Sequence, residues 1–188
     1  NMLMQSNLEE LKEVKKIVTM CPHCSVNLGI EYPKYAKINY KVFHHTQLIE
    51  ELIKNKDIIV QKNNNDKITF HDPCNLSRMM DEVSAPRTAL DSACNNYTEL
   101  EESGKNTLCC GAGGGHMWME DSGGQRINHM RIDQFLDTEG ETLGVSCPFC
   151  YQMFAEGIQS KGVQESKQTK DLVEIIAESV VPKEEEEK

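Results

Sequence analysis

The sequence has 188 residues, of which 38% are hydrophobic, and it carries 30 acidic against 20 basic side chains. This length and composition exclude a disordered chain and fit one domain or two small ones. The net charge of −10 argues against nucleic acid as a partner, because proteins that bind it usually present a basic face. No apolar run approaches the ~20 residues that span a bilayer, and Asn1–Glu13 shows no secretory pattern. We expect a cytoplasmic chain that is at most peripheral to a membrane.

Short β-like segments alternate with longer helix-like segments along the chain. In chain order we expect a strand at 15–20, a helix at 24–35, a strand at 38–44, a helix at 46–53 with Thr46 as N-cap, a polar turn at 63–66, a strand at 67–70, a helix at 86–93 opened by Pro86, a strand at 107–108, a helix at 126–136, a strand at 143–145 and a helix at 171–180. This alternation predicts an α/β fold in which mainly parallel sheets are flanked by helices.

Part of the sequence occurs twice. Residues 16–24 resemble residues 143–150, with their cysteines offset by 126 positions, and residues 46–50 resemble residues 170–174 at an offset of 124. Nothing in the first copy matches Cys74 or the adjacent Cys109 and Cys110, so we expect the chain to be the C-terminal part of something longer. The expected division is an incomplete first unit at 1–62, a complete second unit at 63–182 and a disordered acidic tail at 183–188.

The eight cysteines are clustered. Clustered cysteines in a chain without a secretory pattern are typical of metal or redox chemistry in a reducing compartment. Five of them lie in the second unit, each group after a predicted strand, and loops that follow parallel strands gather at one edge of a sheet. These five thiols can therefore converge. They are Cys74, Cys109, Cys110, Cys147 and Cys150; Cys21 and Cys24 form a pair in the first unit, and Cys94 fits neither set and is interpreted as a small buried hydrophobe.

Thiolates select zinc, copper(I) or iron–sulfur clusters. A single zinc ion takes four ligands, so five thiols exceed its needs, and the adjacent Cys109 and Cys110 are poorly placed to occupy two vertices of one ion. A multi-iron cluster offers several irons to neighbouring thiolates. A zinc site, including zinc that replaces iron, and a strained Cys109–Cys110 disulfide remain as alternatives.

Several motifs together carry a family resemblance that extends from Lys15 to Val180. The chain resembles the cysteine-rich "CCG" domain found in heterodisulfide reductase and in glycolate oxidase iron–sulfur subunits. It is similar above all to membrane-associated iron–sulfur oxidoreductases that work with electron-transfer flavoprotein and acyl-CoA dehydrogenases. The matching stretches are Cys21–Cys24, His44–Gln47, His71–Cys74, Cys109–Gly115, Met117–Glu120 and Arg126–Asn128. The sequence differs from the usual pattern at Asn75, Ser77 and His116.

The resemblance implies a non-cubane [4Fe–4S] cluster held by Cys74, Cys109, Cys110, Cys147 and Cys150. It also implies that Cys21 and Cys24 are ligands of a second site that is incomplete here. The implied partners are upstream ferredoxin-like and membrane domains or subunits and an electron-transfer flavoprotein or another flavoprotein. The implied function is electron relay between the flavoprotein and a quinone-linked module, as an oxidoreductase component that is inactive alone. The alternatives are disulfide cleavage of the heterodisulfide reductase kind and a zinc-binding structural module.

The remaining candidate residues flank the thiols. The glycine loop 111–115 lacks the features of a nucleotide-binding loop, and we expect its backbone amides to pack against cluster sulfurs. We assign a supporting or capping role to His71 and Asp72, with proton delivery as the alternative, and a structural role to His44 and His45. His23 and His116 lie beside thiols and are candidate proton donors. Residues 117–119 are interpreted as core or interface packing.

Overall fold

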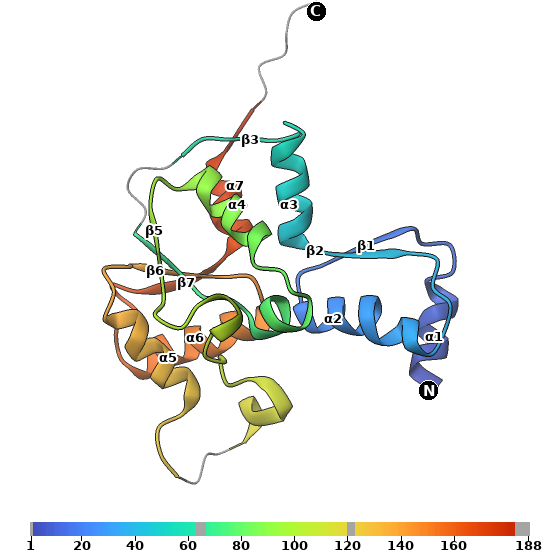
Figure 1. Cartoon of the computed structure of the whole chain (residues 1–188). Helices are drawn as coiled ribbons and strands as arrows, with labels where there is room; N and C mark the ends of the chain where they lie inside the picture. Colours follow the sequence, from blue (N-terminus) through green and yellow to red (C-terminus); the bar gives the residue numbers. More distant parts are fainter. Residues whose placement is uncertain (1, 63–66, 120–122, 183–188) are drawn as a thin grey trace, which may run out of the picture.

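The computed structural model describes residues 2–62, 67–119 and 123–182, and it contains helices and strands in alternation (Figure 1). The α-helices are α1 (Met2–Glu10), α2 (Pro22–Val26), α3 (His45–Lys54), α4 (Ser84–Ala93), α5 (Ile127–Leu136), α6 (Pro148–Ser160) and α7 (Leu172–Ser179). The strands are β1 (Lys16–Thr19), β2 (Lys41–His44), β3 (Ile59–Val60), β4 (Ile68–Phe70), β5 (Tyr97–Glu99), β6 (Thr142–Val145), β7 (Gln168–Asp171) and β8 (Val180–Val181). Short helical turns are η1 (Asn27–Glu31), η2 (Tyr32–Lys34), η3 (Asn75–Met79), η4 (Gly104–Asn106) and η5 (Gly113–Trp118).

The largest sheet has the strand order β5-β4-β6-β7, and all three of its pairings are parallel. Helices cover both faces. On one face α5 and α6 pack on β6 through residues such as Phe135 and Phe154, and on the other α3, α4 and α7 pack on β4 through residues such as Leu90 and Ile175 (Figure 1). The predicted α/β class, with parallel strands between helices, is confirmed.

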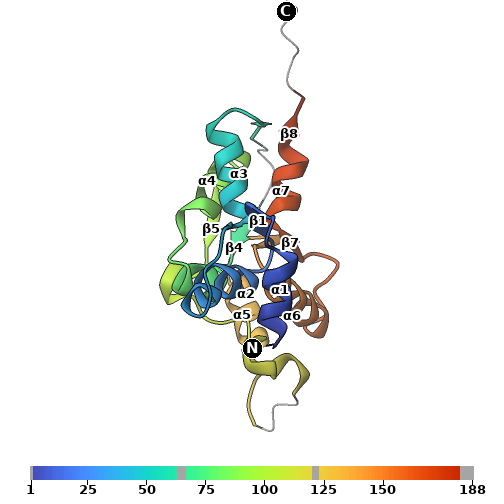
Figure 2. The same cartoon turned by 90° about the vertical axis from the view of Figure 1, so that its right-hand side faces the viewer.

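Two small sheets complete the fold. Strands β1 and β2 pair in parallel beside α2, and Figure 2 shows α1 and α2 on the side of the molecule that faces the viewer. Strand β3 pairs antiparallel with β8, Ile59 opposite Val181. This pairing joins the end of the predicted first unit to the last strand of the second.

The internal repeat is visible in the order of the elements, because β1-α2-β2-α3 recurs as β6-α6-β7-α7 with both strand pairs parallel. The last helix of each copy is capped in the same way. The backbone N–H of His44 donates to Gln47 Oε1 at 3.0 Å, and that of Asp171 donates to Glu174 Oε2 at 2.8 Å. The two N-caps are thus offset by 127 positions, and the sequence alignment at an offset of 124 was wrong for this helix.

Several predicted boundaries differ from the structure. The N-cap of α3 is His44 and not Thr46, because the side chain of Gln47 accepts a hydrogen bond from the backbone N–H of His44. The helical stretch predicted to begin at Cys24 begins at Pro22, a residue that is preorganised for the first turn. Helix α1 was not predicted. Strand β2 is shorter than predicted, and α4 begins two residues before Pro86.

The strand predicted at residues 107–108 is wrong. Thr107 instead follows the turn η4, and its hydroxyl donates to the carbonyl of Asp72 at 3.0 Å. The edge strand next to β4 is β5, with Tyr97 opposite Ile68. The predicted turn at 63–66 and the predicted acidic tail at 183–188 lie outside the described residues.

Candidate metal centre

Five cysteines converge at the carboxyl ends of β4 and β6. Cys74 follows β4 and precedes η3, Cys147 is the N-cap of α6 directly after β6, and Cys150 lies in the first turn of α6. Cys109 and Cys110 come from the loop after η4. A cavity of about 40 Å³ is lined by all five together with Pro22, His23, Pro73, Asn75, Ala112 and Gly113. The predicted convergence of the five thiols is therefore found in the structure.

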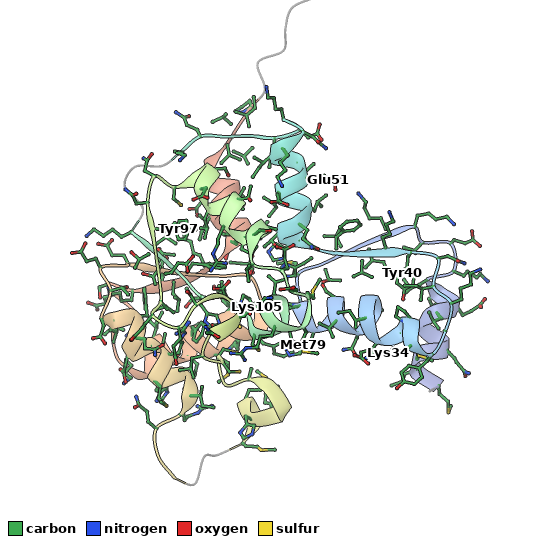
Figure 3. The ribbon with its side chains drawn as sticks, viewed as in Figure 1. Lys34, Tyr40, Glu51, Met79, Tyr97 and Lys105 are labelled. Atoms are coloured by element: carbon green, nitrogen blue, oxygen red, sulfur yellow. The ribbon has the colours of Figure 1, made fainter. Side chains whose placement is uncertain are left out.

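The segments that carry Cys74 and Cys109 are joined side by side. The turns η3 and η4 are in contact, and Figure 3 labels Met79 and Lys105 on them. Arg78 Nε donates to the carbonyl of Lys105 at 2.8 Å. Where the sequence predicted a strand before Cys109, the structure has the turn η4, and this hydrogen bond links η4 to η3.

The sulfurs interact in a row, in the order Cys74, Cys109, Cys110, Cys150 and Cys147. Hydrogen bonds from Cys110 and Cys74 lower the pKa of Cys109, and a hydrogen bond from Cys150 lowers the pKa of Cys147 to about 5. The same contacts raise the pKa of each partner, that of Cys110 to about 12. Neighbouring thiolates repel one another, so the positive charge of a metal centre would favour the loss of their protons.

The row is open and is not a tetrahedral cage. Across the described residues, no three His, Cys, Asp or Glu side chains are arranged to hold a single metal ion. All eight cysteines lie in the described part, and none of them is in a disulfide. Cys110, Cys147 and Cys150 are buried, whereas Cys74 and Cys109 are half-buried. Five thiols that line one cavity suit a group that accepts several soft ligands.

His23 reaches this cavity from the first repeat. Its Nε2 lies 3.0 Å from Asn75 Nδ2, and a hydrogen bond to Cys147 raises the pKa of His23. Its Nδ1 lies 3.9 Å from Cys21 Sγ. Cys21 and Cys24 themselves do not line the cavity. The structure therefore brings five of the seven predicted ligands together, and it adds His23 at the mouth.

The glycine loop supplies backbone donors to the sulfurs. The N–H of Gly111 donates to Cys109 Sγ at 3.4 Å, and that of Ala112 donates to Cys110. Gly111 has φ of +87°, and a Cβ there would lie 3.1 Å from the Cβ of Ile127. These two amides contact cysteine sulfurs, and their packing against the sulfurs of a cluster stays a prediction.

Buried polar residues support the cavity from behind. Asp72 forms a two-pronged ion pair with Arg87, at 2.9 Å for each contact, and accepts from the N–H of Gly104 at 2.6 Å. His71 is fully buried and accepts a hydrogen bond from Arg131 Nε at 3.2 Å. Neither arginine was predicted from the sequence, because each stands on a helix remote in sequence from the cysteines.

Comparison with known proteins agrees with this site. The family model described as CCG, a cysteine-rich domain, matches residues 1–29 and 68–155. The chain belongs to the CCG cysteine-rich domain family. The two matched stretches include all seven cysteines that were predicted as ligands from the sequence.

Relatives of this CCG chain are named as oxidoreductases. A probable iron-sulfur-binding oxidoreductase FadF of Bacillus subtilis is 37% identical over 95% of this chain and 26% of its own length. An EtfAB:quinone oxidoreductase of Syntrophomonas wolfei is 35% identical over 93% of this chain and 26% of its own length. One of the subunits of the dihydromethanophenazine:CoB--CoM heterodisulfide reductase of Methanosarcina barkeri is 30% identical over 95% of this chain and 44% of its own length. The predicted resemblance and the prediction of an oxidoreductase component agree with these names, and the chain spans about a quarter of the first two relatives.

The paired histidines of the CCG chain lie between the repeats and do not line the thiol cavity. His44 Nδ1 lies 2.8 Å from Thr46 Oγ1, and its Nε2 lies 3.3 Å from the carbonyl of Met20. His45 Nε2 lies 3.1 Å from Asp171 Oδ1 without the alignment of a hydrogen bond. Burial lowers the pKa of His44 to about 4. The predicted structural role of both residues agrees with this placement.

A second, more open cavity adjoins the first. It has a volume of about 320 Å³, and its lining residues are His23, Ala112, Gly113, Gly114, Gly115, Met117, Trp118 and Phe149. Trp118 is 83% exposed and Met119 is 55% exposed, so these two side chains do not pack in the core, and their interface packing stays a prediction. Cys94 is 1% exposed within the core cluster of α4, as predicted.

No helix among the described residues has both the length and the apolar character needed to cross a membrane.

Proposed function

We propose that this chain binds a non-cubane [4Fe–4S] cluster through Cys74, Cys109, Cys110, Cys147 and Cys150 and relays electrons. The observation that carries the proposal is the convergence of five thiols, from three separate segments, on one cavity. Iron–sulfur clusters are held by cysteine thiolates, and the adjacent Cys109 and Cys110 suit two neighbouring irons better than one ion.

The protein around the cavity has two tasks. The buried Cys110, Cys147 and Cys150 exclude water from one side, while the loop amides at Gly111 and Ala112 donate to sulfur. When bound, the cluster supplies one-electron redox chemistry. Hydrogen bonds to sulfur and the degree of solvent exposure set the potential of such a centre.

The proposal extends to a second metal site and to the electron-transfer partners. Cys21 and Cys24 are ligands of a second site completed by residues outside this chain, and the division into units at residue 63 follows from the repeat. One relative's name joins EtfAB to a quinone, which supports a flavoprotein as electron donor and a quinone-linked module as acceptor. Another is named a probable membrane-anchored ferredoxin, which supports upstream ferredoxin-like and membrane partners and a peripheral location.

The test is anaerobic reconstitution with iron and sulfide, followed by metal and sulfide analysis and EPR. We expect about four irons with matching sulfide at the five-thiol site. Cys110→Ser should lose the cluster spectrum, whereas Cys94→Ser, a change at a buried cysteine outside the cavity, should keep it. Stoichiometric zinc without sulfide would instead establish the zinc-binding structural module, and a full spectrum in Cys110→Ser would remove the five-thiolate assignment.

Disulfide cleavage is the second candidate function. The cavity of about 320 Å³ shares His23, Ala112 and Gly113 with the thiol cavity, so a substrate held there would lie beside the cluster. The Methanosarcina barkeri relative is named for a heterodisulfide. Reduction of a heterodisulfide by the reconstituted protein, without any reaction with reduced flavoprotein, would favour this function over electron relay.

A further inference from the structure

Arg131 is a buried cation whose hydrogen bonds all go to neutral groups. Its side chain, on α5, is fully buried. Its Nη2 donates to the carbonyl of Glu102 at 2.6 Å and to Thr107 Oγ1 at 3.2 Å, its Nη1 donates to Gln134, and its Nε donates to His71. In the described part of the chain, no carboxylate forms an ion pair with it. Asp72, a buried acid whose charge acts on Arg131, is already paired with Arg87.

A buried charge is expensive unless an opposite charge compensates it. The carboxylates of Glu102 and Asp72 act on Arg131 only through space, as Cys150 does when it is deprotonated. Arg131 is therefore a fixed positive charge that acts on the thiol row through Cys150. A thiolate-bound centre in the cavity is the missing negative partner.

The same arginine fixes the tautomer of His71. A guanidinium has donors and no acceptor, so Nδ1 of His71 must present a lone pair to Arg131 Nε. The proton of the neutral imidazole is then on Nε2. Because the guanidinium draws electron density from the ring, it makes this N–H a stronger donor. A carboxylate or carbonyl, which is the usual partner of a metal-binding histidine, would instead make the ring more electron-rich and a weaker donor.

The Nε2 donor of His71 is buried and has no hydrogen-bond partner in the described residues. The ring is held edge-on against Phe154, with centroids 4.6 Å apart, so it cannot turn freely to find another acceptor. Cys109 is the thiol whose charge acts on His71. Buried polar groups without partners are rare in proteins, and the Arg131 that fixes this ring also donates to Thr107, two residues before Cys109.

We propose that Arg131 and His71 form a positioning pair in which the arginine keeps the proton on Nε2 of His71, and Nε2–H donates to sulfur beside Cys109. This inference rests on the proposed function. It makes His71 a donor and excludes it as a ligand through Nε2. Reduction adds negative charge to a cluster, so the donor and the buried cation together raise the reduction potential.

The first test uses NMR of the protein labelled with ¹⁵N-histidine, before and after reconstitution. We expect Nδ1 of His71 to be unprotonated and Nε2 to be protonated in both states, with the signal assigned by its absence in His71→Gln. In Arg131→Met we expect His71 to lose its preference for the proton on Nε2. An unprotonated Nε2 in the unmodified protein would overturn the inference whatever the cluster does.

The second test is the reduction potential measured by EPR-monitored titration. His71→Met and Arg131→Met should shift the potential to more negative values. His71→Gln should keep it near the parent value, because its amide oxygen can accept from Arg131 while its NH₂ donates. Arg126→Met is the matched control, since Arg126 adjoins the same helix but is already paired with Glu156, and it should shift the potential less.

Failure of the proposed function and failure of the inference about His71 give different results. A parent protein that takes up no iron and sulfide removes the proposed function, and with it the acceptor for His71. A loaded protein whose potential in His71→Met equals that of the Arg126→Met control removes the inference alone. His71→Gln, which retains the hydrogen bond to Arg131, keeps the comparison valid if Arg131→Met does not fold.

Discussion

His23 and Phe149 occupy the same position in the two Cys-Pro-x-Cys turns, and their rings meet edge to face with centroids 5.5 Å apart at 76°. Each turn follows the first strand of its repeat, so the two copies contact each other through equivalent side chains. The contact lies at the mouth of the thiol cavity, because both residues line the adjoining open cavity. The first repeat therefore contributes directly to the site of the second.

We expect His23→Ala to destabilise the protein by about 1–2 kcal/mol, because it removes the hydrogen bond to Asn75 and the ring contact with Phe149. Urea unfolding followed by circular dichroism measures the change. Tyr35→Ala is the control, since this aromatic residue is 73% exposed and its loss should cost within about 0.5 kcal/mol. Equal losses in the two variants would show that the contact between the repeats carries no stability.

Asp72→Ala should be more damaging, at about 3 kcal/mol, because it leaves Arg87 and the N–H of Gly104 without their buried partner. The segment that carries Cys74 should loosen at the same time. Lys170→Ala removes an exposed ion pair with Glu178 and should cost less than about 1 kcal/mol. Chemical unfolding of both variants gives the comparison, and a cost for Asp72→Ala as small as that of the control would contradict a structural role for this pair.

Much of the site could be predicted from the sequence because it depends on local patterns. The β-branched strands before Cys74 and Cys147 set these cysteines at one sheet edge, and the parallel topology brings them together. The Cys-Pro-x-Cys stretch occurs twice in the sequence, and both copies begin helices in the structure.

The missed features depend on tertiary contacts. Thr107 looks like a strand residue by propensity, but the hydrogen bond to Asp72 and the neighbouring turn η3 hold it as a loop. Arg131 lies on a helix whose sequence gives no sign that a cation would be buried there. Trp118 lines an open cavity, and hydrophobicity alone does not distinguish a side chain that packs in the core from one that is exposed for packing at an interface.

Stability should fall as the pH drops from about 6.5 towards 4. The pKa of His44 is lowered to about 4 by burial, so the unfolded chain binds a proton in this window that the folded chain does not. Its contribution is complete above pH 6.5 and is lost as the pH falls, with a size of about 3 kcal/mol. Burial also lowers the pKa of His71, which adds to the same slope. The raised pKa of His23 acts in the opposite sense.

Urea unfolding at several pH values from 7.5 to 4.5 measures this dependence. His44→Gln should flatten the curve without abolishing it, because His71 remains. A variant curve parallel to that of the parent would show that His44 titrates normally in the folded protein.

Two glycines of one loop should respond differently to alanine. Gly111→Ala places a side chain at φ of +87° and sets its Cβ 3.1 Å from the Cβ of Ile127, so backbone strain of about 1 kcal/mol adds to a steric clash. The loop amide that donates to Cys109 should move with it. Gly113→Ala is the matched control, because no heavy atom lies within 4 Å of its Cβ and its φ is not positive. Thermal unfolding should show a clear loss for Gly111→Ala and little change for Gly113→Ala, and reconstituted iron content should fall in Gly111→Ala. Equal behaviour of the two would mean that the loop backbone adapts, and that its amides are not held in place by the Gly111 turn.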